Sequence, residues 1–312
     1  MFGRVSIIGV GLIGGSLARD LRRLQLCGEL VGCGRGLENL RRGVELGVID
    51  RFEQDPARAV AGADLVVLAV PLGAVGPVLA SLYPALADGA IVTDVGSAKQ
   101  SVIAAAKAAL GRVPTNLVPG HPIAGTERSG VEAALDGLYQ DRRVILTPTE
   151  ETDPAALARI RAMWSAVGAE VIQMGAAHHD EVLAATSHLP HLLAYTLVDV
   201  LGGMEERVEI FRYAAGGFRD FSRIASSDPQ MWHDICVANQ AALSGVLDGF
   251  QQALTRLQRA VAAGEGDYLH QMFTRSKAIR DRYTAMTQSQ VTAGAEGEAA
   301  SDVPGGAPVS PQ

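Results

Sequence analysis

The stretch Gly9-Val10-Gly11-Leu12-Ile13-Gly14 decides the fold, because it stands between a predicted strand at residues 4–8 and a predicted helix at residues 12–26. In a GxGxxG loop the first glycine permits a tight turn and the second lets the backbone approach a pyrophosphate. The third lets helix and strand pack closely. The phosphates then lie at the amino end of the helix, which attracts anions. The stretch therefore predicts a dinucleotide site that includes Gly9, Gly11, Leu12, Ile13 and Gly14.

Short apolar runs alternate with helical patterns through the first half of the chain. We predict strands at residues 30–33, 64–70, 90–94, 116–118, 143–147 and 170–172, and helices at 37–46, at 98–110 and from Asp153-Pro154 onward. Residues 64–70 are apolar enough for a strand buried on both faces of a sheet, and Val70 and Pro71 at its end are expected to contact the cofactor. This alternation predicts an α/β fold, a Rossmann-type doubly wound parallel sheet.

From residue 176 onward the patterns are helical. Helices are predicted at residues 179–201, 231–263 and 268–283, and the first is apolar nearly all round, which predicts burial in a bundle or a dimer core. We therefore expect a dinucleotide-binding domain at 1–175 and an all-α substrate and dimerisation domain at 176–283. Residues 284–312 lack aromatic and basic side chains and predict a disordered tail.

Composition narrows the classes of partner. The formal charge of -7 argues against nucleic acid, although a local arginine cluster could still bind a small anionic substrate. Three cysteines without a CxxC pair predict neither a disulfide framework nor a zinc site and fit a reducing cytoplasm. The sequence shows no signal peptide and no apolar run of membrane-spanning length, so we expect a cytoplasmic protein with no membrane partner.

The choice between NAD and NADP depends on the end of the second predicted strand. Many dinucleotide sites carry an acidic residue there that holds the ribose hydroxyls, but this chain reads Cys33-Gly34-Arg35-Gly36. Arg35 can accommodate a 2′-phosphate, which favours NADP or use of both cofactors. NAD remains open, as does a role for Arg35 as a solvated loop residue.

Two segments are expected at the carboxyl edge of the sheet, where such folds collect ligands. The first contains Ser97, which with Gln100 also fits a capping box, a structural role. The second contains His121 in an apolar loop rich in glycine and proline. Histidine titrates near neutrality, so His121 is a candidate acid–base group, although a turn histidine bonded to backbone is the alternative.

The helical half adds further polar groups. His188 and His191 stand three residues apart on one helical face around Pro190, which predicts a kink. A metal pair is the alternative, but no third ligand stands at metalloenzyme spacing, so we expect no metal. Arg223 ends a short glycine-rich segment and is suited to bidentate binding of a carboxylate. Arg219 and Asp220 in the same segment could instead pair and staple the loop.

Taken in order, these motifs resemble the prephenate/arogenate dehydrogenase family of tyrosine biosynthesis. The resemblance covers residues 1–283 and rests on Gly9-x-Gly11-Leu12-Ile13-Gly14-Gly15-Ser16, Asp94-Val95-Gly96-Ser97-x-Lys99, His121-Pro122-Ile123-Ala124-Gly125-Thr126-Glu127, His179-Asp180, Ser187-His188-Leu189-Pro190-His191 and Gly217-Phe218-Arg219-Asp220-Phe221-Ser222-Arg223-Ile224-Ala225. No chorismate mutase segment or ACT-type regulatory domain is recognisable, so the monofunctional form is expected.

The resemblance implies a reaction and roles for single residues. The enzyme would oxidise the C4 hydroxyl of prephenate, arogenate or both, NAD(P)+ would accept the hydride, and the ring would lose CO2. His121 would take the hydroxyl proton, with Ser97 orienting the imidazole. Arg223 would bind a substrate carboxylate, and the resemblance assigns the rest of the pocket to His188, His191, Thr126, Glu127 and Asp220. A homodimer through the helical domain is also implied.

Two other functions remain as alternatives. A β-hydroxyacid-type dehydrogenase would have a similar layout, but such enzymes use a lysine in the helical half, and Lys277 is the only lysine after Lys107. A non-catalytic dinucleotide-sensing module would bind the cofactor without turnover and would have no need of His121.

Overall fold

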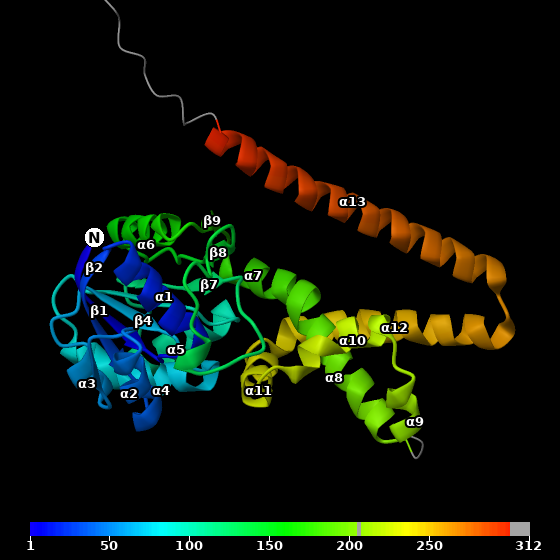
Figure 1. Ribbon diagram of the computed structural model, residues 1–312, viewed down its shortest axis with the longest axis horizontal. Helices are drawn as coiled ribbons and strands as arrows, with labels where there is room; N and C mark the ends of the chain where they lie inside the picture. The colour runs from blue at the N-terminus through cyan, green and yellow to red at the C-terminus, as the bar shows by residue number, and fades with distance from the viewer. Residues whose placement is uncertain (205–206, 300–312) are drawn as a thin grey trace, which may run out of the picture. The chain divides into compact units, whose positions relative to one another are not determined.

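The computed structural model describes residues 1–204 and 207–299 (Figure 1). The chain forms two compact units, of which the first covers Met1–Leu247 and the second begins at Asp248. The first unit holds both the sheets and most of the helices that follow them.

A six-stranded parallel sheet forms the centre of the first unit. Its order is β3-β2-β1-β4-β5-β6, and the strands are β1 (Phe2–Ile8), β2 (Cys27–Cys33), β3 (Arg51–Glu53), β4 (Leu65–Leu68), β5 (Ile91–Asp94) and β6 (Leu117–Val118). The order reverses direction between β1 and β4, and such a switch point opens a crevice at the carboxyl ends of the strands. The predicted Rossmann-type parallel sheet is confirmed.

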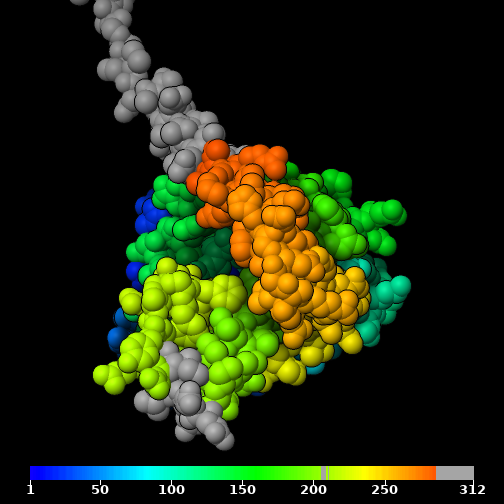
Figure 2. Space-filling model, turned by 90° about the vertical axis from the view of Figure 1, so that its right-hand side faces the viewer, coloured from blue at the N-terminus to red at the C-terminus, as the bar shows by residue number. Residues whose placement is uncertain are grey.

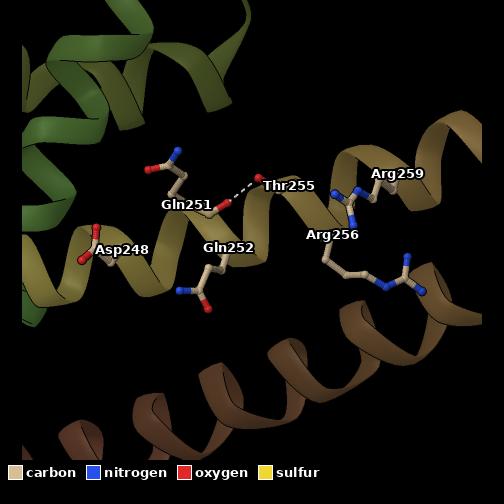
Figure 3. A pocket seen from close by; sticks show the side chains of 6 residues that line it. All are labelled: Asp248, Gln251, Gln252, Thr255, Arg256 and Arg259. Atoms are coloured by element: carbon tan, nitrogen blue, oxygen red, sulfur yellow. Dashed lines mark hydrogen bonds between the residues drawn. The ribbon is translucent and has the colours of Figure 1, made fainter.

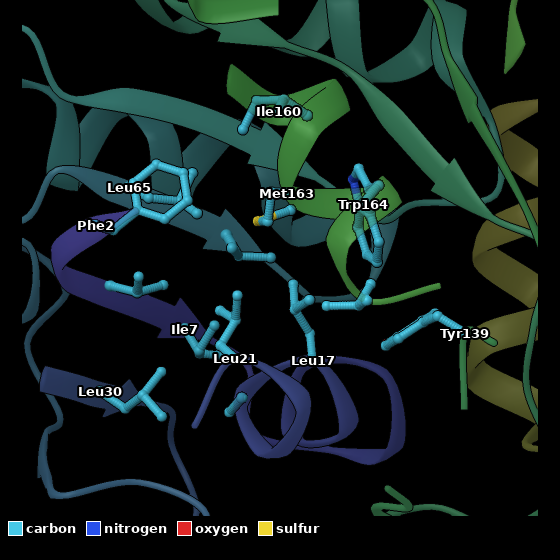
Figure 4. Close-up of a cluster of buried hydrophobic side chains, with 14 of the residues drawn as sticks. Phe2, Ile7, Leu17, Leu21, Leu30, Leu65, Tyr139, Ile160, Met163 and Trp164 are labelled. Carbon is cyan, nitrogen blue, oxygen red and sulfur yellow. The ribbon is translucent and has the colours of Figure 1, made fainter. Parts of the chain in front are cut away.

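Helices cover both faces of this sheet. They are α1 (Leu12–Arg23), α2 (Leu37–Glu45), α3 (Pro56–Ala59), α4 (Val75–Leu82), α5 (Lys99–Leu110) and α6 (Pro154–Ala166). One apolar cluster joins the sheet to α1 and α6 and includes Leu17, Leu21, Met163 and Trp164 (Figure 4). A second cluster on the other face includes residues of α3, α4 and α5. Two buried faces account for the apolar runs of the central strands.

A separate three-stranded sheet corrects one prediction. Its order is β7-β8-β9, made of β7 (Gly120–Pro122), β8 (Arg143–Leu146) and β9 (Glu170–Gln173), and β7 runs antiparallel to β8. His121 therefore lies in a strand, opposite Ile145, and not in the loop that we expected. Gly120 and Pro122 concealed this strand. Proline is tolerated here because β7 is an edge strand.

The remainder of the first unit is helical. It contains α7 (Ala176–Leu183), a π-helical turn (Ala184–His188), α8 (Leu189–Gly202), α9 (Arg207–Arg212), α10 (Gly216–Ser222) and α11 (Pro229–Ala238). The single helix predicted at residues 179–201 is thus interrupted by the π turn. Pro190 has no N–H, and its ring would press on the carbonyl of Thr186 in a regular α-helix, so the widened turn accommodates it.

The helix predicted at residues 231–263 is also two helices, because α11 ends at Ala238, with Asn239 as its C-cap, and α12 (Gln240–Ala263) follows. The second unit contains most of α12 and all of α13 (Gly266–Ala299). We expected a disordered tail from residue 284, whereas α13 continues to Ala299 through a stretch that contains good helix formers and no proline. The rest of that predicted tail, residues 300–312, lies outside the described residues.

The second unit exposes several large apolar side chains. They lie on α12 and α13, whose surfaces face the viewer in yellow and orange in Figure 2, and include Leu254, Val261, Phe273 and Ile279. Across residues 1–204 and 207–299, no helix combines the length and the hydropathy that a membrane span requires.

Candidate active site

The glycine loop forms a cradle at the switch point of the sheet. Gly9 has a φ of +104°, and a Cβ there would lie 2.6 Å from the carbonyl carbon of Ala69 after β4. A Cβ at Gly14 would lie 2.8 Å from the side chain of Ile7. By contrast, a Cβ at Gly11 would meet nothing within 4 Å, and Gly11 caps α1 without any side-chain bond. Open space at the amino end of a helix fits a pyrophosphate group.

The other predicted cofactor residues surround this cradle. Leu12 and Ile13 begin α1, and the Ile13 carbonyl accepts a hydrogen bond from the Tyr139 hydroxyl at 2.5 Å. Val70 and Pro71 follow β4 directly, beside Gly9. These positions line the edge of the sheet at which a dinucleotide is expected.

Arg35 stands exposed just beyond β2. Its carbonyl accepts a hydrogen bond from Gln54, and its guanidinium has no partner among the described residues. Burial, together with the charges of Asp55 and Glu53, raises the pKa of Cys33 to about 11. Carboxylates therefore do lie near the end of β2, although they come from β3 and from the start of α3.

A chain of three buried side chains begins at His121. The Nδ1 atom of His121 lies 2.9 Å from Nε2 of His179, and Nδ1 of His179 lies 2.8 Å from a carboxylate oxygen of Asp180. In the sequence, His179 and Asp180 stand out only as part of the motif His179-Asp180. Burial, and then the nearby charges of His179, Lys99 and His188, lower the pKa of His121 well below its usual value. The lowered pKa favours the neutral imidazole of His121 at pH 7.

Asp180 also caps helix α5. Its two carboxylate oxygens accept hydrogen bonds from the backbone N–H of Lys99 at 2.7 Å and of Gln100 at 3.0 Å. The predicted capping box of Ser97 and Gln100 is wrong, since Ala98 is the N-cap residue and makes no side-chain cap. Burial alone would raise the pKa of Asp180, but the bonds from His179 and the two N–H groups together lower it.

A buried ion pair lies next to this chain. The Lys99 ammonium bonds to Asp94 and, at 2.6 Å, to the carbonyl of Gly120. Asp94 in turn accepts the N–H of Gly96 at 2.8 Å and that of Gly120 at 3.2 Å. The pair thus ties the end of β5 to the start of β7 and fixes the backbone beside His121. Burial lowers the pKa of Lys99, even though Asp94 opposes the shift.

His188 and His191 lie against one tryptophan. The His191 ring stacks on Trp232 with centroids 3.8 Å apart, and His188 meets the same ring edge-on at 6.1 Å. Asn239 donates to Nδ1 of His188 at 3.1 Å. Nε2 of His188 and Nε1 of Trp232 are buried without a partner in the described structure, so this corner holds two unsatisfied donors.

The local pattern around Trp232 and Asn239 had given no sign of a site. Burial lowers the pKa of His188 to about 4 and also lowers the pKa of His191. No group of three or more metal-ligating side chains occurs within the described residues.

The remaining candidates are more exposed. Arg223 and Glu127 form an ion pair at 3.4 Å, and Thr126 lines a cleft of about 520 Å³ that also includes Gly125 and Arg142. Asp220 is exposed, and no pair with Arg219 occurs in the part of the chain that the structure describes. Ser97 is half-buried at the start of α5, and no hydrogen bond joins it to His121, whose Nδ1 bonds to His179 instead.

A second hollow runs along α12 in the second unit. It is lined by Asp248, Gln251, Gln252, Thr255, Arg256 and Arg259 (Figure 3). Arg256 already pairs with Glu265 at 2.5 Å and lies over the ring of Tyr268. The lining side chains are exposed or half-buried and include no histidine or other group suited to acid–base chemistry near neutral pH, so the catalytic candidates remain those around His121.

Comparison with known proteins agrees with this geometry. The family model described as the nucleotide-binding domain of prephenate dehydrogenase matches residues 17–173, and that described as its dimerization domain matches residues 175–275. Cyclohexadienyl dehydrogenase of Zymomonas mobilis is 42% identical over 285 residues, which cover 90% of this chain and 96% of that protein.

Solved structures give the same result. Prephenate dehydrogenase from Aquifex aeolicus, in complex with hydroxyphenyl propionate and NAD+, superposes with a TM-score of 0.83 at 37% identity, over 90% of this chain and 98% of that chain. Arogenate dehydrogenase of Synechocystis superposes with a TM-score of 0.74 at 31% identity, over 90% and 99%. The glycine cradle, the buried histidine chain and these similarities together show that the chain belongs to the prephenate dehydrogenase family.

Proposed function

We propose that this chain catalyses the oxidative decarboxylation of prephenate, arogenate or both, with NAD(P)+ as the hydride acceptor. The observation that carries the proposal is the buried base. His121 lies on β7, which the Lys99–Asp94 pair joins to the carboxyl end of β5. The glycine cradle lies at the same edge of the parallel sheet, where the carboxyl ends of its strands meet. A base at this edge can reach a substrate that lies against a bound nicotinamide ring.

The relatives support both the substrate class and the cofactor. One solved relative is described with hydroxyphenyl propionate and NAD+, another is named an arogenate dehydrogenase, and a third relative is named a cyclohexadienyl dehydrogenase. The two enzyme names are those of dehydrogenases, and the hydroxyphenyl ring of the bound compound has the aromatic form that the proposed reaction would produce. The open space at Gly11 and the free amino end of α1 support the dinucleotide.

The proposed chemistry uses a single protein base. His121 accepts the proton of the C4 hydroxyl through Nε2 while C4 loses its hydride, which the nicotinamide accepts when the cofactor is bound. The C4 ketone then withdraws the electron pair of the bond between the ring and its carboxylate. CO2 leaves, the oxygen regains a proton, and the ring becomes aromatic. Aromatisation drives this step, so no metal ion is required.

We assign substrate contacts to the polar groups around the base. Arg223 would bind a carboxylate of the substrate, for which a guanidinium offers two parallel donors. His188 and His191, held by Asn239 and Trp232, would line the pocket. The remaining candidates are Thr126, Glu127 and Asp220 near the pocket mouth, and Ser97 just ahead of α5.

The finer cofactor and assembly assignments are also proposals. Arg35 would hold a 2′-phosphate, so the enzyme would use NADP+ or both cofactors, with the nearby carboxylates of Glu53 and Asp55 limiting that preference. A homodimer would bury the apolar side chains of α12 and α13, in line with the dimerization-domain match. The free thiols of Cys27, Cys33 and Cys236 support a cytoplasmic location.

Cofactor reduction tests the proposal directly. We would follow absorbance at 340 nm with prephenate and with arogenate, each combined with NAD+ and with NADP+. Turnover in any combination would support the reaction, and the four rates would rank substrates and cofactors. Dinucleotide binding without turnover in all four mixtures would refute it and favour a sensing module.

A further inference from the structure

The hydrogen bonds around His121 determine where its protons lie. Asp180 is buried, and its oxygens already accept hydrogen bonds from the N–H groups of Lys99 and Gln100, which favours the ionised carboxylate. An ionised carboxylate has no proton to give. In the 2.8 Å contact between Asp180 and His179, the donor is therefore Nδ1–H of His179.

The same reasoning extends one residue further. A neutral imidazole carries one proton, so a His179 protonated at Nδ1 has a lone pair at Nε2. That lone pair faces Nδ1 of His121 at 2.9 Å, and the contact is a hydrogen bond only if His121 donates its Nδ1–H. Neutral His121 then has its lone pair at Nε2, for which the described residues supply no partner.

We propose that His179 and Asp180 are positioning residues that hold His121 as the Nδ1–H tautomer, so that Nε2 is the base that accepts the substrate proton. This assignment rests on the proposed function, since it names how the base of that reaction is prepared. In hydrolase triads, a carboxylate fixes the tautomer of the catalytic histidine in the same way. Here a second imidazole is inserted between the carboxylate and the base.

The surroundings of the two imidazoles already hold one buried cation. Lys99 on α5 is fully buried, is paired with Asp94 of β5, and its charge lowers the pKa of His121. His188 approaches from the π turn, and Asp180 on α7 is in direct contact with His179. An additional buried cation beside Lys99 would be costly in this low-dielectric region.

The architecture also explains why the arrangement is rigid. Asp180 is held at both ends, because its carboxylate caps α5 and its backbone carbonyl accepts the side-chain N–H of Asn239 at 2.8 Å. His121 is held by β7 pairing with β8. The two imidazoles therefore meet from elements that are fixed independently, as a positioned base requires.

Nitrogen NMR of the protein labelled with 15N-histidine tests the assignment without reference to turnover. The resonance that disappears in His121→Asn identifies His121. We expect the wild type to show a protonated Nδ1 and an unprotonated Nε2. In His179→Leu the tautomer should shift toward Nε2–H, and in His179→Gln, whose amide oxygen can accept the Nδ1–H, the original tautomer should largely return. His178→Leu, at the exposed neighbouring position, is the matched control and should leave the spectrum of His121 unchanged.

Kinetics supply the second readout. His179→Leu should lower kcat roughly 10- to 100-fold, a share of the 10²–10⁴-fold that a positioned base contributes, with KM changed less than about twofold. His179→Gln should recover part of this loss. A wild-type His121 protonated at Nε2, or an unchanged tautomer and kcat in His179→Leu, would overturn the inference. An inactive wild type with the Nδ1–H tautomer would refute the proposed reaction but not the hydrogen-bonded chain.

Discussion

Gly9 and Ala69 lie so close together that no side chain fits at residue 9, where a Cβ would lie 2.6 Å from the carbonyl carbon of Ala69. The contact joins the turn after β1 to the end of β4, at the switch point of the sheet. Gly11, two residues later, has open space around it. The two glycines are therefore needed for different reasons. Gly9 allows the protein's own backbone to pack, whereas Gly11 leaves room for a ligand to approach.

Alanine substitutions should separate these two constraints. Gly9→Ala, with its positive φ and its clash, should lower the thermal midpoint by several degrees and weaken cofactor binding as well. Gly11→Ala should keep the thermal midpoint within about 1 °C of the wild type, because the added Cβ would contact no protein atom. The same Cβ should weaken NAD(P)+ binding about tenfold or more, because it occupies space next to the cofactor. Differential scanning fluorimetry and cofactor titration measure the two effects. Equal loss of stability in both variants would contradict this division.

Removal of the base should reduce turnover selectively. His121→Asn keeps a polar side chain of similar size but cannot accept the substrate proton, so kcat should fall roughly 10²–10⁴-fold while KM stays nearly constant. Steady-state kinetics at saturating cofactor measure both constants. Retention of wild-type kcat would remove His121 from the role of base.

Acidification should destabilise the protein through its buried histidines. The pKa of His188 is about 4 in the folded chain and about 6.5 when unfolded, so the unfolded chain binds a proton first as the pH falls. This contribution to stability is complete above pH 6.5 and is lost between pH 6.5 and 4, on the order of 3 kcal/mol in total. The lowered pKa values of His121 and His191 act in the same direction.

Urea denaturation at pH 7 and pH 5 measures this loss. The midpoint should fall on acidification, and the fall should be smaller in His188→Gln, which removes one titrating group. His270→Gln, a substitution at an exposed histidine of α13, is the matched control and should show the same fall in midpoint as the wild type. An identical pH dependence in wild type and His188→Gln would show that His188 does not contribute.

Arg223 should affect substrate binding without affecting stability. Its ion pair with Glu127 is exposed at 3.4 Å, and such pairs contribute little to folding. Arg223→Ala should therefore raise KM for the substrate tenfold or more and leave the thermal midpoint unchanged, with Arg223→Lys intermediate. If KM stays the same in Arg223→Ala, the carboxylate contact is made by another residue.

Cofactor choice should depend on Arg35. Arg35→Ala should raise KM for NADP+ about tenfold while KM for NAD+ changes less than about twofold, because only NADP+ carries the 2′-phosphate. Arg41→Ala, an exposed arginine on the neighbouring helix α2, is the matched control and should change neither constant. Parallel changes for both cofactors would argue against a phosphate contact.

Local signals in the sequence predicted most of the α/β framework. Alternating apolar runs indicated the strands of the parallel sheet. Asp153 was predicted to start a helix because it precedes a proline, and its carboxylate accepts hydrogen bonds from the first turn of α6. These features depend on residues only a few positions apart, which a sequence displays directly.

The unpredicted features depend on residues far apart in the chain. Ser97 and Gln100 do form a local capping pattern, but Asp180, 81 residues after Lys99, supplies a charged acceptor that binds the N–H groups instead. His121 meets His179 across 58 residues, and His188 meets Asn239 across 51. No local pattern encodes such pairs, so the sequence indicated His121 as a candidate without indicating its partner.

The capping of α5 by Asp180 has a consequence for how the enzyme matures on the ribosome. Synthesis proceeds from the amino terminus, and domains begin to fold as they emerge. The six strands of the parallel sheet and the glycine cradle are complete by residue 118, whereas His121 gains its partner only after residues 179 and 180 have appeared. On the ribosome the residues of the parallel sheet and the glycine cradle are therefore made before those that contact His121, and the hydrogen bonds between Asp180 and α5 and between His121 and His179 can form only once α7 has docked against α5.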